Sequence, residues 1–438
     1  MRFLLDAEQR AFAASLDALL TAADTPAVVR EWSRGDHASG RALWSRLAEA
    51  GVFALAVPEA YEGLGPRPVD LAVAFVELGR HAVPGPLVET VTAAVLLTGS
   101  DPSTAKRLLP GLASGETVAT VTPPGPAGSV PEQPPGPTGT VPEQPPGLAE
   151  TLPEQPPGPA GTVPEQPPGP TETLPEQPPG PTETVPEQPP GPATVPEQPP
   201  GPAETLPEQP PGPATTLPEQ PPEPTEAVPA QPPVGTRAPG LPQGPYALDG
   251  DAATLRLSWE PDGVRLSPGH GPARASLDPA RRLTPLTPGG ELLAAPSHAA
   301  LSWARLATAA QALGVGLALL DRTADHVKRR HQFGVPVGSF QAVKHRLADA
   351  KIALEFARPL VFGAALTLDP ADVAAAKVTA CEAAYTTALT ALRLHGAIGY
   401  TAEFDLSLWL TKARALRTAW GTPEECRALV VSAGDLRW

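Results

Sequence analysis

The sequence predicts a mainly α-helical fold with a small β-domain in its middle and a proline-rich insertion. Two observations lead to this prediction. Apolar residues recur three and four positions apart over residues 1–118 and again over 298–438, which is the period of a helix with one buried face. Short apolar runs separated by Gly and Pro occupy 119–124 and 234–297, the pattern of strands and turns. The 438 residues are enough for two or three domains with a sizeable core.

The first 118 residues are predicted to form an N-terminal helical domain. Pro84 and Pro86 bracket the start of its last predicted helix. A loop rich in Gly and Pro interrupts the helical pattern at 53–68. The predicted helices are 7–23, 40–53, 69–82 and 84–99.

Residues 125–233 form a tandem repeat, GPxxTVPEQPP and its variants, in ten copies. The block holds 39 of the 63 prolines, 15 glutamates and no Lys, Arg or Asp. Because proline removes helix donors and the repeat offers little apolar surface to bury, we expect a solvated, disordered polyproline II segment. Two interpretations stay open: an arm that docks in SH3- or WW-like grooves, and a repeat expansion inside a surface loop.

The segments on either side of the repeat complete the prediction. A truncated middle β-domain is expected from 119–124 and 234–297, with strands in 117–124, 244–259, 262–268 and 280–288. Residues 298–438 are expected to form a C-terminal helical bundle, in which Pro359 is the one proline late in a long helix. The predicted helices of the bundle are 298–332, 338–366, 370–395, 403–418 and 422–434.

Charge and cysteine content exclude several classes of protein. The formal net charge of −15 equals the charge of the 15 repeat glutamates, so the acidity says nothing about the partners of the folded part. Cys381 and Cys426 are too few for a disulfide framework, which indicates a reducing cytoplasm. Asp6 and Glu8 interrupt the apolar N-terminus, so we expect no signal peptide. We also expect no membrane span, since no uncharged apolar run reaches about 18 residues, and no nucleic-acid binding.

The most specific motifs stand in the C-terminal part. They read RRHQFGVPVGSFQAVKHRLADAKIALEFAR at 329–358 and LHGAIGYTAEFDLSLWLTKAR at 394–414. Both closely resemble the C-terminal helical domain of acyl-CoA dehydrogenases, and LPGLASGE at 109–116 resembles part of their N-terminal domain. The resemblance implies a helical N-terminal domain, a β-barrel-like middle domain and a C-terminal four-helix bundle. It also implies a flavoprotein that removes two hydrogens across Cα–Cβ of a CoA thioester.

The resemblance places FAD between the β-domain and the C-terminal bundle, with a neighbouring subunit completing the site. In the family motif R-x-x-F-G, Arg330 would hold the FAD pyrophosphate through its forked guanidinium. Phe333 and Gly334 complete this motif, and Gln341 follows in family spacing.

A second motif, Q-x-H-G-G-x-G-Y in the family, reads RLHGAIGY here. His395, Gly396 and Gly399 are retained and would contact the adenosine half of FAD. Arg393 replaces the Gln and gives a possible phosphate contact. Ala397 replaces the second Gly and adds a Cβ where the backbone should approach the cofactor.

The catalytic base is missing from both places where the family carries it. Abstraction of the α-proton needs a base within hydrogen-bond reach, and the family supplies a Glu in a Glu-Gly-Thr turn. Here that position is Trp420, whose indole has no basic lone pair. A minority of the family has its Glu on the first C-terminal helix, where this chain has Ala304. Glu424 and Glu425 are candidates for a rescue, although helix starts favour Glu for dipole reasons as well.

Base-lacking members of the family resemble one partner of a mixed assembly. Our first hypothesis is therefore a flavin-dependent acyl-CoA dehydrogenase subunit beside a base-bearing paralogue, acting on a fatty acyl-CoA or a sterol side-chain CoA, with an electron-accepting flavoprotein downstream. The second is a non-catalytic scaffolding subunit that has lost FAD and uses the repeat as an interaction arm. The third is a flavin enzyme with oxygen-dependent chemistry that needs no carboxylate. We expect no metal site, because His326, His331 and His345 lack partners at ligand spacing.

Overall fold

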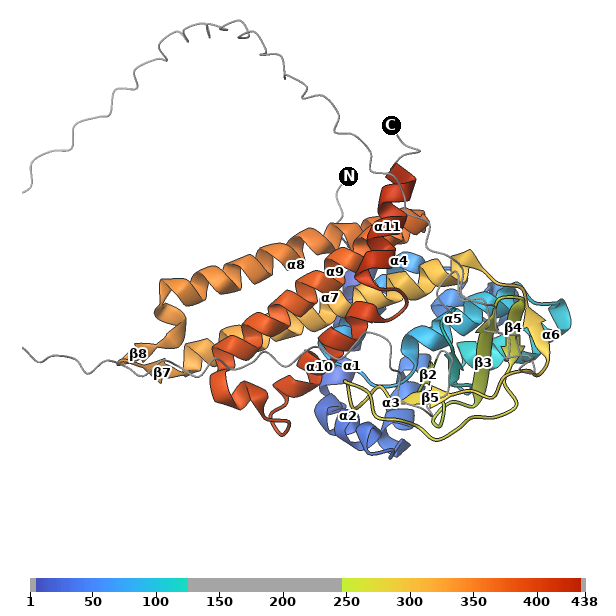
Figure 1. Ribbon diagram of the computed structural model, residues 1–438, viewed down its shortest axis with the longest axis horizontal. Coiled ribbons are helices and arrows are strands. Elements are labelled where there is room, and N and C mark those ends of the chain that lie inside the picture. Colours follow the sequence, from blue (N-terminus) through green and yellow to red (C-terminus); the bar gives the residue numbers. More distant parts are fainter. Residues whose placement is uncertain (1–4, 125–245, 435–438) are drawn as a thin grey trace, which may run out of the picture. The chain divides into compact units, whose positions relative to one another are not determined.

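The computed structural model describes residues 5–124 and 246–434 (Figure 1). The described residues on both sides of the repeat belong to one folded unit. The repeat at 125–233, for which the sequence predicts a disordered polyproline II segment, lies outside the described residues.

Helices fill the chain before the first strand. Asp6 accepts a hydrogen bond from the Gln9 backbone N–H while the Gln9 side chain accepts from the Asp6 N–H, a capping box that starts the first helix. The four predicted helices are present with shifted ends, and two further helices, α2 and α6, were not predicted. The elements are α1 (Ala7–Thr21), α2 (Thr25–Ser33), α3 (Ala38–Glu49), η1 (Phe53–Ala56), η2 (Glu59–Tyr61), α4 (Pro68–Arg80), α5 (Leu87–Thr98) and α6 (Pro102–Ala113).

Strands from both sides of the repeat pair with each other. The strands are β1 (Ala119–Val121), β2 (Tyr246–Leu248), β3 (Leu255–Glu260), β4 (Gly263–Leu266), β5 (Leu283–Pro285) and β6 (Leu292–Ala294). One sheet has the order β1-β3-β4-β6, with β1 parallel to β3, and β2 pairs with β5 in a second sheet. The Thr120 hydroxyl donates to the Leu248 carbonyl over 2.6 Å and joins the two sheets. These six strands thus form two small open sheets, not a closed barrel.

Long helices dominate the C-terminal part, as the sequence predicts. Three predicted helix ends differ from the structure by three residues: the first helix stops before 330, the second starts only at 341, and the fourth starts only at 406. Phe333 and Gly334 have φ values of 54° and 77°, left-handed conformations that turn the chain into a hairpin. The elements are α7 (His298–Arg329), β7 (His331–Gln332), β8 (Val335–Pro336), η3 (Val337–Ser339), α8 (Gln341–Thr367), α9 (Pro370–His395), η4 (Gly396–Tyr400), α10 (Leu406–Thr418) and α11 (Pro423–Gly434).

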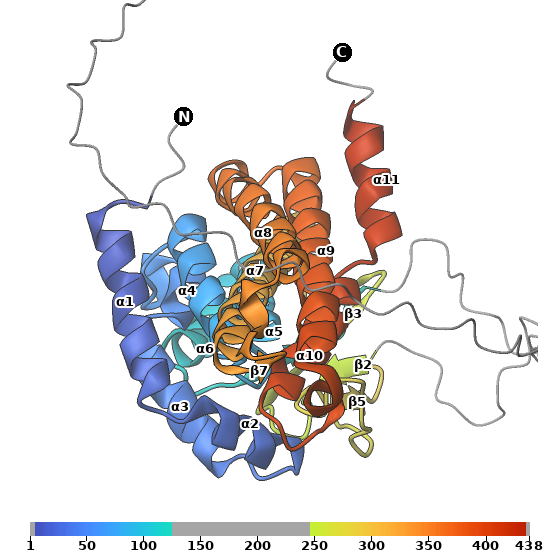
Figure 2. The ribbon, with the colours of Figure 1, turned by 90° about the vertical axis from the view of Figure 1, so that its left-hand side faces the viewer.

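Helix α7 is the centre of the folded unit and packs against α4, α5, α8, α9 and α10. Figure 2 shows it between the blue N-terminal helices and the orange and red C-terminal helices. The backbones of α4 and α7 touch at two glycines. A Cβ on Gly314 would lie 1.9 Å from the Val76 carbonyl oxygen, and a Cβ on Gly79 would lie 2.0 Å from the Gln311 carbonyl oxygen. No larger residue fits this crossing without moving a helix.

The apolar character of α7 follows from this position. By length and composition α7 could cross a membrane, but 89% of its most apolar window is buried inside the protein. A helix that is apolar on all sides is what the core of a protein of this size requires. Its composition is therefore explained by packing.

Candidate functional site

The hairpin after α7 brings the two predicted cofactor motifs together. Arg330 ends α7, and its Nη1 donates to the His395 carbonyl oxygen at the end of α9 over 2.8 Å. A Cβ built on Gly396 would lie 3.6 Å from the same Nη1. Gly396 has a φ of 65° and a ψ of −141°, a conformation that favours glycine. The guanidinium and an accessible stretch of backbone therefore form one corner, which we call the Arg330–Gly396 corner.

The predicted residues Phe333, Gln341 and Arg393 are exposed, and they belong to the hairpin after α7, the start of α8 and the end of α9. Phe333 is 92% exposed at the hairpin tip, and its ring meets Phe340 edge-on at 6.3 Å between centroids. Ile398 and Tyr400 of η4 are exposed as well. An exposed apolar group of this kind around a cationic corner is typical of a surface that a partner covers.

His395 and Gly399, also predicted to contact the cofactor, have internal roles. The His395 side chain is 1% exposed, and its Nδ1 lies 2.8 Å from the Ala391 carbonyl oxygen, to which it donates. Its ring stacks on His326 with 4.0 Å between centroids. Burial lowers the pKa of both imidazoles, that of His326 to about 4, so the stack is neutral at pH 7. A Cβ on Gly399 would lie 3.1 Å from the Leu392 carbonyl oxygen, so this glycine serves the turn itself.

The usual base position is filled by an indole that is tied to the N-terminal domain. Trp420 is 6% exposed and has a φ of 58°. Its Nε1 donates to Glu89 Oε1 of α5 over 3.2 Å, while Arg305 Nε donates to the Trp420 carbonyl oxygen over 3.0 Å. Ala304, the alternative base position, is fully buried in α7.

Glu89 was missed by the sequence analysis. Its side chain is buried, its Oε2 has no hydrogen-bond partner among the described residues, and burial raises its pKa. The sequence feature that could have identified Glu89 is a single carboxylate inside the apolar run LVETVTAAVLL of α5, where no exposed helix face is expected. A buried carboxyl next to the base position is an internal partner for Trp420.

Glu424 and Glu425 start α11 and face solvent. Glu425 Oε2 accepts from the Thr422 backbone N–H over 2.8 Å, and Thr422 Oγ1 accepts from the Glu425 N–H over 3.2 Å. This reciprocal pair is a capping box. The backbone N–H of Glu424 lowers the pKa of the exposed carboxyl of the same residue. Both glutamates are thus helix-start residues, and neither contacts the indole of Trp420.

A buried ion pair joins the middle strands' loop to α10. Lys412 and Asp278 are 2% and 1% exposed, and their charged atoms lie 3.8 Å apart. Lys412 Nζ also donates to the Val83 carbonyl oxygen over 3.2 Å. Sequence analysis missed both residues, although a lysine on the buried face of a helix is itself a signal. The ion pair fills part of the contact between the strand region and the C-terminal helices.

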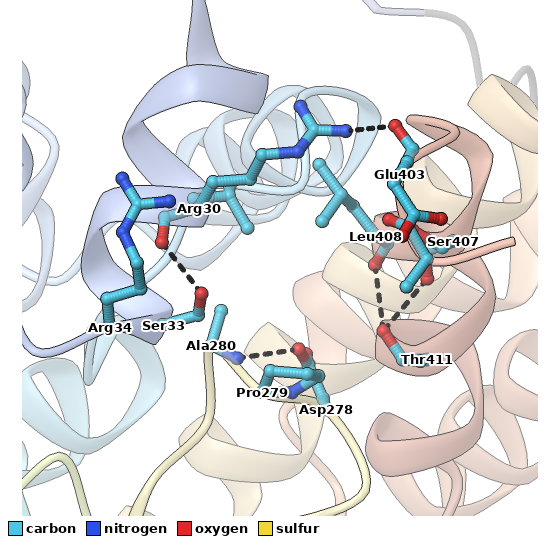
Figure 3. Close-up of a pocket in the computed structure, with 12 residues that line it drawn as sticks. Arg30, Ser33, Arg34, Asp278, Pro279, Ala280, Glu403, Ser407, Leu408 and Thr411 are labelled. Carbon is cyan, nitrogen blue, oxygen red and sulfur yellow. Dashed lines mark hydrogen bonds between the residues drawn. The ribbon is translucent and has the colours of Figure 1, made fainter.

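A cavity of about 330 Å³ opens beside this ion pair (Figure 3). It lies between α2, the loop around Pro279 and the start of α10. Arg30 spans its edge, 2.5 Å from Asp405 and 3.0 Å from the Glu403 carbonyl oxygen. This volume is at the lower end of the range for small-molecule sites.

The described residues fit a flavin in one half of the implied site only. The Arg330–Gly396 corner offers a forked cation and free backbone, the donor set that a pyrophosphate needs. The resemblance places FAD between the β-domain and the C-terminal bundle, and a contact between these two parts, that of the loop at Asp278 with α10, holds a buried ion pair. Among the described residues, the donor set that suits a phosphate is thus present at this corner, whereas a complete cofactor site is not.

Comparison with known proteins agrees with the architecture. The family model for the acyl-CoA dehydrogenase N-terminal domain matches residues 6–116, and the model for the C-terminal domain matches 296–433. Among solved structures, the ChsE4–ChsE5 complex from Mycobacterium tuberculosis has a TM-score of 0.62 at 20% identity, covering 99% of this chain and 98% of that chain. A Tcur3481–Tcur3483 steroid ACAD variant has a TM-score of 0.63 at 21% identity, covering 98% and 99%.

Two curated proteins show sequence similarity over part of their length. The acyl-CoA dehydrogenase IpdE2 of Mycobacterium tuberculosis is 35% identical over 151 residues, 34% of this chain and 48% of that protein. The 3-sulfinopropanoyl-CoA desulfinase of Paraburkholderia xenovorans is 39% identical over 136 residues, 30% of this chain and 34% of that protein. The chain thus matches about half, or less, of the length of these relatives. With both terminal domain models matched in their proper order, the chain belongs to the acyl-CoA dehydrogenase family.

Proposed function

We propose that this chain is the base-lacking subunit of a two-component acyl-CoA dehydrogenase, in which a paralogue supplies the catalytic carboxylate. The observation that carries the proposal is a contrast between two places in the chain. The base position is filled by Trp420, hydrogen-bonded to the buried Glu89. At the Arg330–Gly396 corner, by contrast, the guanidinium is held by a hydrogen bond, and exposed apolar side chains surround it.

In this function the chain's own residues bind and orient the cofactor from outside the reacting centre. A bound FAD would supply the hydride acceptor for the reaction. Arg330 would hold its pyrophosphate by two parallel N–H donors, and the hydrogen bond to the His395 carbonyl oxygen fixes the guanidinium in place. Gly396 leaves the backbone open to the same phosphates. Phe333 and Phe340 would lie against the partner chain that carries the rest of the site.

The proposed substrate is a CoA thioester of a fatty acid or a sterol side chain. The names of relatives support this class: ChsE4–ChsE5 is a complex of two chains, and the Tcur3481–Tcur3483 protein is described as a steroid ACAD. Both likenesses are below 25% identity and support the fold, so the substrate class is part of the proposal. We place the assembly in the cytoplasm, with an electron-accepting flavoprotein as the final partner.

The experiment is to express the chain alone and together with a base-bearing paralogue, and to record the visible flavin spectrum with and without acyl-CoA. We expect flavin in the pair, bleached by substrate, and none or inert flavin in the chain alone. Arg330→Met in the pair should weaken flavin binding by at least about tenfold. Arg329→Met is the matched control, because Arg329 Nε bonds only its own helix at the Asp325 carbonyl oxygen.

A second function is supported if the chain and its paralogue form a complex that contains no flavin. The chain would then be a scaffolding subunit. The buried Lys412–Asp278 ion pair supports this second function, because it fills part of the contact between the strand region and the C-terminal helices. Bleaching of flavin by the chain alone would contradict both functions, since it requires a base in this chain. Equal flavin loss in the Arg329 and Arg330 variants would remove the role proposed for the Arg330–Gly396 corner.

A further inference from the structure

Helices α1 and α4 bring one imidazole and two carboxylates together, outside the site described above. Glu77 and His81 stand four residues apart at the end of α4, so they share one face of it. Asp17 reaches them from α1, and its Oδ1 lies 2.8 Å from His81 Nε2. One ligand atom from each of the three residues lies within 4.8 Å of the other two. This grouping is the Asp17–Glu77–His81 cluster.

Glu77 is the member of the cluster with the fewest partners. Its side chain is 14% exposed, and its ion pair with Arg80 is long, at 3.7 Å. No hydrogen bond to its carboxylate is present among the described residues, apart from this ion pair. Burial raises the pKa of Glu77 to about 7, against the attraction of Arg80. Its cationic partner among the described residues is therefore Arg80, at a distance that holds the carboxylate only weakly.

The nearby cations have carboxylates of their own. Arg80 Nη2 lies 3.0 Å from Asp321, and Arg358 Nε lies 3.3 Å from Glu355. Arg80 is therefore shared between Asp321 and Glu77, and its contact with Asp321 is the shorter of the two. Asp17 is 56% exposed, so one side of the cluster is open to solvent.

We propose that Asp17, Glu77 and His81 bind a first-row divalent metal ion of the Zn²⁺ type, which fastens α1 to α4. One imidazole nitrogen and two carboxylate oxygens are a donor set that suits such ions, and the open side leaves room for water as a further ligand. The sequence analysis expected no metal site, because the histidines it considered lack partners at ligand spacing. Asp17 and Glu77 are 60 residues apart in the chain, and the packing of α1 on α4 joins them.

The test is titration of the full-length protein with Co²⁺ and Zn²⁺, followed by the visible Co²⁺ spectrum and by thermal unfolding. We expect one ion per chain and a higher Tm with Zn²⁺. Glu77→Gln mimics the protonated carboxyl, so this variant should fold and should bind at least about tenfold more weakly. His81→Gln should lose the imidazole contribution to the Co²⁺ spectrum.

His331→Gln is the control, because His331 lies exposed in the hairpin and bonds only to the Arg329 carbonyl oxygen. It should bind both ions like the unchanged protein. Absence of saturable binding would overturn the proposal. Binding that survives both Glu77→Gln and His81→Gln would overturn it as well, since the ion would then lie elsewhere.

Discussion

The indole of Trp420 donates a hydrogen bond to Glu89 Oε1 over 3.2 Å, although 331 residues separate the two in the chain. The bond joins the turn before α11 to the first turn of α5, and both side chains are buried. The turn keeps the left-handed φ of 58° at Trp420. The Trp420 indole has no basic lone pair. Its hydrogen bond to Glu89 is a polar contact between the C-terminal and the N-terminal helices.

Trp420→Phe should destabilise the protein by about 1–3 kcal/mol, because it leaves the Glu89 carboxyl without its donor in a buried place. Denaturant unfolding measures this change. Glu89→Gln should cost less, since burial already favours the neutral form of Glu89. In a double-mutant cycle the two changes should be non-additive. Additive losses would show that the hydrogen bond contributes nothing to the free energy of unfolding.

Lys412→Met should reduce the free energy of unfolding by about 3–5 kcal/mol, because Asp278 then stays buried without a counter-charge. Lys412→Met combined with Asp278→Asn should recover part of this loss. Urea unfolding followed by circular dichroism compares the variants. Lys328→Met is the control, since Lys328 is 73% exposed and pairs only with Asp325, and it should change stability by less than about 0.5 kcal/mol.

Asp249 should make the protein less stable as the pH rises. Burial raises the pKa of Asp249 to about 7 from an ordinary value of 3.8. The folded state therefore holds more protons than the unfolded state between these values, and the free energy of unfolding falls as the pH rises from about 4 to 7. The contribution of Asp249 is on the order of 2–4 kcal/mol.

Asp249→Asn should flatten this pH dependence. The amide oxygen can still accept from the Arg282 backbone N–H, as Oδ1 does over 2.9 Å. Unfolding measured at several pH values from 5 to 8 checks the slope. Glu77 and Glu89 add slopes of the same sign, so some dependence should remain. Asp262→Asn, at a 59% exposed carboxylate, should leave the slope unchanged in this range.

Gly314→Ala should destabilise the protein by about 1–3 kcal/mol, although alanine favours helices. The new Cβ would meet the Val76 carbonyl oxygen at 1.9 Å, so α4 and α7 must separate. Gly99→Ala is the matched control, because its Cβ would lie 3.5 Å from the nearest atom. It should change the free energy of unfolding by less than about 1 kcal/mol. Equal effects of both changes would contradict the close crossing.

The long helices could be predicted because their apolar period repeats over many turns. Helices α8 and α9 were predicted with ends within three residues of those observed. The nine-residue α2 and the three-residue β6 were missed, since a period cannot build up over so few positions. The turn at Phe333 and Gly334 was predicted, but the helix before it was extended over 331–332, two residues that pair with 335–336 instead.

The candidate site could be predicted where a motif is local and could not where packing assembles it. Arg330 and Gly396 belong to two motifs that the sequence itself displays, and the structure joins them through the His395 carbonyl oxygen. The contacts of Trp420 with Glu89 and of Lys412 with Asp278 link residues more than a hundred positions apart. In both pairs, neither the helical periodicity around one residue nor its spacing from a motif indicates which residue it contacts.

The hydrogen bonds of β1 with β3 and of Thr120 with Leu248 fasten the chain on both sides of residues 125–245. The inserted stretch therefore begins and ends on neighbouring, independently anchored strands. Loop-closure entropy grows only with the logarithm of loop length, so gaining or losing one 11-residue copy should alter it by about 0.1 kcal/mol. A change in the number of copies should therefore leave the free energy of unfolding of the folded part almost unchanged.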